Sequence, residues 1–139
     1  MSEETDELAA REQGASFSGL VGIEYTDDDP GHTTARIPVR AELLQPFGIV
    51  HGGVMSTLIE SVTSRATTLV VLQEGMAAMG QSITVNFMRP ISEGTVEVLA
   101  HARHRGRTTW VWDAEVRDSQ DRLCALAQMT IAVRPLPKG

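Results

Sequence analysis

The sequence lacks several features that mark common classes of protein. It has one cysteine in 139 residues, so no disulfide can form within the chain, which suits a reducing cytoplasm. Its net charge is −6, so the basic character typical of nucleic-acid-binding proteins is absent. Residues 1–13 are acidic without the apolar core of a signal peptide, and no apolar run is long enough to span a bilayer. We therefore expect one cytoplasmic domain with no nucleic-acid or membrane partner.

The motifs of several familiar active sites are also missing. The chain contains no G-x-S-x-G, no G-x-x-x-x-G-K-[ST] and no G-x-G-x-x-G. His101 and His104 are three residues apart around a strand end, so we expect them to point to opposite faces and not to pair as zinc ligands. Cys124 is expected to be a buried apolar residue, with a reactive thiol as the alternative. Residues 27–31 hold three adjacent carboxylates without the spacing of a calcium loop, and predict a solvated turn. We expect no metal and no cofactor.

What the chain does have is a long segment of helical periodicity, residues 48–74. One predicted face is apolar and carries Val54, Met55, Leu58, Ile59, Val62, Ala66, Leu69 and Val70. The other is small and hydroxylic and carries Gly52, Gly53, Ser56, Thr57, Ser64, and Thr67 or Thr68. Between residues 53 and 73 the only charged side chains are Glu60 and Arg65. A helix so poor in charge is expected to be buried nearly all round, so Glu60 must be paired, neutralised or functional. An ion pair with Arg65 is the alternative to a functional role.

The remaining segments predict strands around this helix. An acidic leader, partly ordered, is expected over residues 1–16 and a single α+β domain over residues 17–139. The expected elements are a turn and first strand within 17–25, strands at 33–39, 78–88, 95–103, 109–117 and 123–133, and a helix C-cap at Gly75. The last four strands can pair by hairpins into an antiparallel sheet. The simplest architecture is a strongly curved sheet wrapped around the helix, with the hydroxylic strip left to meet another subunit.

The segment His51-Gly52-Gly53 stands where a loop becomes this helix. Glycine there lets a ligand approach the first free backbone N–H groups, where the helix dipole adds positive potential. A carbonyl oxygen at this point would be polarised and an oxyanion stabilised. The alternative is that the glycines shape a tight turn and His51 caps the helix. Glu60 lies eight residues beyond Gly52, ~12 Å along the axis, so both can act on one carbonyl only if they come from two chains.

The pattern Gln45, His51-Gly52, Glu60, Ser64 resembles the active-site pattern of hot-dog-fold acyl-CoA thioesterases. It most resembles the branch of tetrameric 4-hydroxybenzoyl-CoA thioesterases with a glutamate on the central helix, close to the phenylacetate-pathway thioesterases. The likeness runs from about residue 22 to residue 135. It includes Gly80-Gln81-Ser82, Phe87-Met88-Arg89-Pro90, Gly94, residues 108–113, residues 122–125 and residues 131–135.

This resemblance implies a role for each motif residue. The Gly52 N–H would hold the thioester carbonyl with help from Gln45, and His51 belongs to the same candidate catalytic set. The partner subunit's Glu60 would attack as a nucleophile or activate a water, which Ser64 would position. The resemblance also implies a curved antiparallel sheet around one helix and a homotetramer built as a dimer of dimers. The implied reaction is hydrolysis of an acyl-CoA without a cofactor, and the resemblance favours an aromatic acyl group over an aliphatic one.

The resemblance places the coenzyme A phosphates at Arg89 and at the turn holding Arg107, Thr108 and Thr109. The chain departs from the family pattern there, because Arg107 replaces a small hydroxylic residue and Pro137 stands where the family has a C-terminal arginine. A solvated turn explains these basic residues about equally well. Two other functions stay open: hydrolysis of a medium-chain acyl-CoA or an acyl carrier protein thioester, and a non-catalytic acyl-CoA sensor.

Overall fold

The computed structural model describes residues 3, 6–7, 10–11 and 16–137, so most of the expected leader lies outside the described residues. The elements in chain order are α2 (Phe17–Val21), β1 (Glu24–Asp29), β2 (His32–Pro38), the 3-10 turn η1 (Ala41–Leu43), α3 (Gly52–Val71), the 3-10 turn η2 (Leu72–Glu74), β3 (Met76–Phe87), β4 (Thr95–Arg105), β5 (Thr109–Arg117) and β6 (Leu123–Pro135). The division into a leader and a domain stays a prediction.

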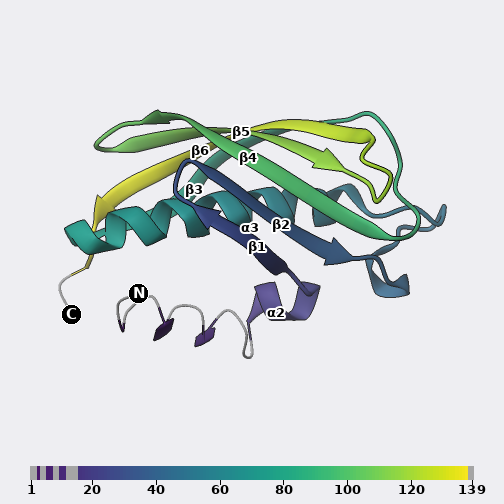
Figure 1. The fold of residues 1–139 in the computed structure, drawn as a ribbon, viewed down its shortest axis with the longest axis horizontal. Coiled ribbons are helices and arrows are strands. Elements are labelled where there is room, and N and C mark those ends of the chain that lie inside the picture. Colours follow the sequence, from purple (N-terminus) through teal and green to yellow (C-terminus); the bar gives the residue numbers. More distant parts are fainter. Residues whose placement is uncertain (1–2, 4–5, 8–9, 12–15, 138–139) are drawn as a thin grey trace.

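One antiparallel sheet of six strands, in the order β1-β2-β4-β5-β6-β3, arches over α3 (Figure 1). This is the curved sheet around one long helix that the sequence predicted, and it is the hot-dog arrangement. Within the part of the chain that the structure describes, no helix is long and apolar enough to cross a membrane.

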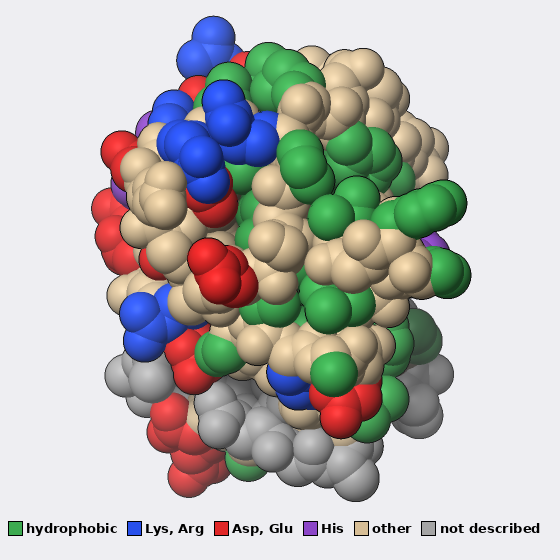
Figure 2. Space-filling view, turned by 90° about the vertical axis from the view of Figure 1, so that its right-hand side faces the viewer, with side chains coloured by type: hydrophobic (Ala, Val, Ile, Leu, Met, Phe, Trp, Pro, Cys, Tyr) green, Lys and Arg blue, Asp and Glu red, His purple; other side chains and the backbone are tan. Residues whose placement is uncertain are grey.

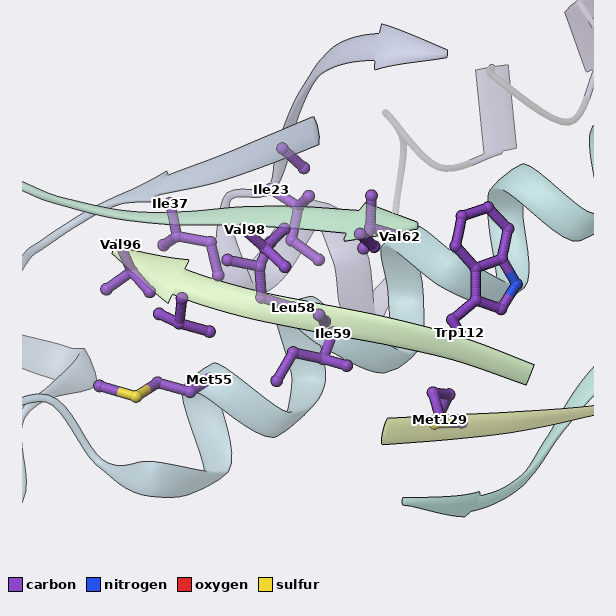
Figure 3. Close-up of a cluster of buried hydrophobic side chains, with 14 of the residues drawn as sticks. Ile23, Ile37, Met55, Leu58, Ile59, Val62, Val96, Val98, Trp112 and Met129 are labelled. Atoms are coloured by element: carbon purple, nitrogen blue, oxygen red, sulfur yellow. The ribbon is translucent and has the colours of Figure 1, made fainter. Parts of the chain in front are cut away.

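The core lies between the concave face of the sheet and the apolar face of α3. Alternate residues of β4, β5 and β6 are buried, as their alternating sequences predicted. Leu58, Ile59 and Val62 of α3 pack against this face (Figure 3). Trp112 is fully buried, and its indole Nε1–H donates to Thr67 Oγ1 at 3.0 Å. Thr67 therefore belongs to the core and not to the uncovered strip, where it was one of two candidates.

The helix begins and ends where the sequence predicted. His51 is the N-cap of α3, and η2 ends at Gly75, which has the left-handed φ of 74° that glycine favours. The expectation of burial nearly all round is wrong for a single chain, because Glu60 is exposed. The sheet covers one side of the helix, and Glu60 lies at the margin of the covered side, next to the edge strand β3.

The expected pairing of β3 with β4 by a hairpin is wrong. The hairpins β4–β5 and β5–β6 are present, but within residues 16–137 β3 pairs only with β6, at the edge of the sheet opposite β1. Strand β3 runs back alongside α3, with Gly80 next to Glu60 and Phe87 next to Gly52. It pairs with β6, and residues 88–94 return the chain to β4 in the middle of the sheet.

The N-terminal elements also differ from expectation. Residues 17–21 form the short helix α2, because the Ser16 hydroxyl accepts the Gly19 N–H at 3.1 Å and caps it. The predicted turn over residues 27–31 is shorter in the structure, since β1 continues to Asp29 and only Pro30 and Gly31 connect it to β2.

His101 and His104 point to the same face, contrary to expectation. His101 pairs with Asp113 and His104 pairs with Val111, so one residue of β4 is unpaired between them. This bulge shifts the alternation of the strand by one residue, so the two side chains lie on one face although they are three residues apart. No group of three metal-ligating side chains occurs among the described residues.

Candidate active site

The start of α3 leaves one backbone donor available. His51 Nδ1 accepts the Gly53 N–H at 2.8 Å, and the Val54 N–H donates to the His51 carbonyl at 2.9 Å. Among the described residues, the Gly52 N–H has no acceptor. The alternative that His51 caps the helix is therefore confirmed, and it is compatible with a free Gly52 N–H. Because Nδ1 accepts, the neutral His51 ring carries its proton on Nε2.

A pocket of about 400 Å³ opens beside this donor. It is lined by Gln45, Ile49, Val50, Gly52, Met55, Phe87, Met88, Arg89 and Pro90. Gly52 makes room for the Phe87 ring, because a Cβ at position 52 would lie 3.0 Å from Phe87 Cζ. The pocket is largely apolar, with the Gly52 N–H, Gln45 and Arg89 as its polar groups. Three of the predicted site residues thus meet at one cavity.

Gln45 is oriented by the loop that carries it. The Gln45 N–H donates to the Ile49 carbonyl at 2.8 Å, and its side-chain Oε1 accepts the Phe47 N–H. The side-chain amide nitrogen is then the end of Gln45 that can donate to a ligand. A hydrogen-bond donor is what a thioester carbonyl oxygen requires.

Glu60 extends from the uncovered strip of α3 toward β3. Among the described residues it forms no ion pair, and Arg65 pairs instead with Asp28 and lies over the Tyr25 ring. The Glu60 carboxylate lies close to Gly80 of β3, where a Cβ would come within 2.7 Å of Glu60 Oε1. Ser64 follows one helical turn later and is half-buried. The carboxylate is therefore available to a ligand or a partner chain.

A single chain does not bring Gly52 and Glu60 together. Gly52 lies against Phe87 at one end of β3, whereas Glu60 lies against Gly80 farther back along the same strand. This agrees with the separation of ~12 Å expected from helical rise.

The candidate phosphate-binding residues also lie apart. Arg89 follows the end of β3 and lines the pocket. The turn of residues 107–109 adjoins Ala132 of β6, which pairs with Met79 of β3. Met79 and Phe87 are separated by ~26 Å at ~3.3 Å per residue of strand. One chain therefore cannot hold one phosphate group with both sets.

The structure adds residues that the sequence did not single out. Phe87 packs on Gly52, and Gly80 lies under Glu60. Arg134 Nη1 donates to the Thr108 carbonyl at 2.7 Å, so a further guanidinium lies at the turn of residues 107–109. The register of β3 against α3 produces the first two contacts, and no local sequence pattern encodes it.

The end of the molecule where α3 begins has two kinds of surface. In Figure 2, hydrophobic side chains gather on one side of this end, and Lys and Arg side chains gather on the other. Phe47, Phe87 and Met88 are among the exposed large hydrophobic residues of the chain. Two larger hollows of about 630 and 560 Å³ lie on the convex face of the sheet, but they contain none of the predicted site residues.

Cys124 lies in the core behind the pocket. It is fully buried, and burial raises the pKa of its thiol. The prediction of a buried apolar cysteine is confirmed, since a thiol that stays protonated is a poor nucleophile.

Comparison with known proteins identifies the family. The model of the thioesterase superfamily matches residues 47–125. A proofreading thioesterase, EntH of Klebsiella pneumoniae, is 34% identical over 113 residues, covering 81% of this chain and 82% of that protein. The crystal structure of a mutant of thioesterase PA1618 from Pseudomonas aeruginosa has a TM-score of 0.88 and 34% identity, covering 98% of this chain and 97% of that one. Thioesterase HI1161 from Haemophilus influenzae has a TM-score of 0.86 and 32% identity, covering 95% and 92%. The chain therefore belongs to the thioesterase superfamily, and it is a thioester hydrolase.

Proposed function

We propose that the protein hydrolyses acyl-CoA thioesters, with aromatic acyl groups preferred, at a site built from two chains. The observation that carries the proposal is that the free Gly52 N–H and the Glu60 carboxylate both lie along the edge strand β3. The aromatic preference comes from the resemblance to the 4-hydroxybenzoyl-CoA branch, and fold-level likeness alone does not determine substrate. A cytoplasmic location also stays a prediction.

The two edges of the sheet support assembly through β3. Strand β1 is a short edge strand with three consecutive aspartates, which discourages pairing with another chain. Strand β3 has 12 residues and exposes Met79, Ile83 and Phe87. A long apolar edge of this kind is suited to antiparallel pairing with a second copy across a two-fold axis. The further association of dimers into a tetramer remains a prediction.

Such a two-fold axis would complete the site. With the axis at Ile83, Gly80 of one chain comes opposite Asn86 of the other, next to Phe87, so the partner subunit's Glu60 approaches Gly52. The same operation moves Arg89 toward the partner's turn of residues 107–109. Each dimer would then contain two equal sites, each with a donor from one chain and a carboxylate from the other.

The chemistry follows from these groups. The thioester carbonyl accepts hydrogen bonds from the Gly52 N–H and the Gln45 amide, which polarise it. The partner subunit's Glu60 then either attacks the carbonyl carbon or removes a proton from an attacking water, which Ser64 orients. The oxyanion that forms is stabilised by the same two donors. Its collapse breaks the carbon–sulfur bond, and the leaving thiolate takes up a proton that comes from water. When water attacks, this collapse gives the carboxylic acid directly. When Glu60 attacks, it gives an anhydride between the acyl group and Glu60, which a water then hydrolyses to the carboxylic acid and the free carboxylate.

A substrate panel tests this proposal. We expect purified protein to release free thiol from benzoyl-, 4-hydroxybenzoyl- and phenylacetyl-CoA with a higher kcat/KM than from octanoyl-CoA. The kcat/KM for the same acyl groups attached to an acyl carrier protein is measured as well. A higher kcat/KM for octanoyl-CoA would refute the aromatic preference, and a preference for the carrier protein would refute CoA as the substrate carrier.

A further inference from the structure

The Glu60 carboxylate occupies a space that only glycine at position 80 leaves open. A Cβ on residue 80 would lie 2.7 Å from Glu60 Oε1 and 3.3 Å from its Cδ. Cβ atoms in proteins essentially never approach another heavy atom within 3.0 Å. No side chain therefore fits at position 80 while Glu60 keeps this conformation.

The backbone conformation does not require a glycine here. Gly80 is absent from the glycines with a left-handed φ, and it pairs with Ile131 next to the bulge that lies between Gly80 and Ser82 in the β3–β6 ladder. Any residue can adopt a backbone without a left-handed φ. Glycine within a strand weakens the strand, and it commonly marks a bulge or the close approach of another group. At Gly80 the approaching group is the Glu60 carboxylate.

A methyl group at position 80 would displace Glu60 in preference to the core. The same Cβ would also lie 2.7 Å from Cε of Met129, which is buried in the core. Glu60 is exposed, so its carboxylate can move into solvent at little cost, whereas the thioether of Met129 is surrounded. The added methyl should therefore move the carboxylate away from the β3 edge.

We infer that Gly80 is a positioning residue that keeps the Glu60 carboxylate at the β3 edge, where it can reach a thioester. The inference rests on the proposed catalytic role of Glu60. Misplacing a reacting group by about 1 Å can lower a rate by about 10²-fold. The strand that would form the interface thus also holds the carboxylate in place.

The first test is Gly80→Ala. We expect kcat to fall about 10- to 100-fold, with KM for the CoA ester and the thermal midpoint nearly unchanged, because substrate contacts and the fold are retained. The matched control is Ser82→Ala, in the same strand. Ser82 pairs with Thr130 beyond the β3 bulge and faces the opposite side of the sheet, so its replacement should leave kcat unchanged. If Gly80→Ala lowers the thermal midpoint, adding Met129→Leu removes the clash in the core, and the same fall in kcat is expected.

The second test is a rescue that a purely structural role would not produce. Glu60→Asp alone should lower kcat, because the carboxylate is withdrawn by one methylene. Combined with Gly80→Ala, the shorter side chain avoids the added methyl, so the two changes should lower kcat by clearly less than the product of their separate effects. Two results would overturn the inference if Glu60→Gln is inactive. One is an unchanged kcat in Gly80→Ala, and the other is a double variant whose kcat falls by the full product of the two separate effects. An active Glu60→Gln would instead overturn the proposed function itself.

Discussion

Among the individual residues, Glu60 has the most specific predicted effect on the reaction. Glu60→Gln keeps the shape of the side chain and removes its ability to attack or to accept a proton. We expect kcat to fall at least ~10²–10⁴-fold, the usual effect of losing a general base, while binding of a CoA ester persists. Turnover can be followed by thiol release, and binding by calorimetry with a non-hydrolysable thioether analogue. Near-normal turnover in this variant would contradict the mechanism.

Arg89 is predicted to recognise the nucleotide part of the substrate. Arg89→Ala should raise KM for a CoA ester more than for the corresponding pantetheine thioester, since only the former carries nucleotide phosphates. Contacts that persist from ground state to transition state change KM chiefly. Arg103→Ala is a suitable control, because Arg103 pairs with Asp113 at 3.3 Å in β5, away from the pocket. Equal effects of Arg89→Ala on both substrates would exclude a phosphate contact.

At the scale of elements, a buried hydrogen bond joins α3 to strand β5 of the sheet. Trp112 Nε1–H donates to Thr67 Oγ1, whose own hydroxyl donates to the Thr63 carbonyl at 2.8 Å. Both side chains are fully buried, so neither can replace the lost partner with water. The helix and β5 are therefore held in one register by a polar contact within an apolar core.

Thr67→Val should destabilise the fold by about 1–3 kcal/mol, the penalty for an unsatisfied buried donor. Valine has nearly the shape of threonine, so packing changes little. The control is Thr68→Val, because among the described residues the half-buried Thr68 hydroxyl bonds only to the Ser64 carbonyl of its own helix. Urea unfolding of both variants measures the difference, and equal free energies of unfolding would show that the Trp112 contact contributes nothing.

The elements differ in how far the sequence could predict them. Helix α3 and strands β4 to β6 follow from local periodicity, because the buried face of each repeats in the sequence. The position of β3 does not, since its pairing with β6 is a long-range contact that no local pattern encodes. The bulge between His101 and His104 was not predicted either, because the residues beyond it are polar and do not show the shift in alternation that it causes. In the candidate site, Gly52 and Gln45 could be predicted because they belong to a local motif. The contacts of Phe87 and Gly80 could not, because they depend on the register of β3 against α3.

At the scale of the whole molecule, the proposed mechanism makes the dimer a requirement for activity, because Gly52 and Glu60 of one chain are too far apart to act on one carbonyl. Co-refolding an inactive Glu60→Gln chain with an inactive Gly52→Ala chain should restore activity. Each heterodimer would contain one site with both defects and one with neither, and so should reach up to about half the activity of a natural dimer. Confirmed heterodimers without activity, under a protocol that refolds the natural chain fully, would mean that each site lies within one chain.

The edge position of β3 also sets an order of events during synthesis. Met76 pairs with Pro135 and Phe87 with Ala125, so β3 has no strand to join until β6 has been made. At ~5–20 residues per second, β3 waits on the order of seconds after it is translated. During that time its apolar side chains are exposed on the ribosome, and Gly80 has no fixed place beneath Glu60. A nascent chain that stalls before β6 would therefore be bound by chaperones. In the proposed mechanism, catalysis becomes possible only after β6 has paired with β3.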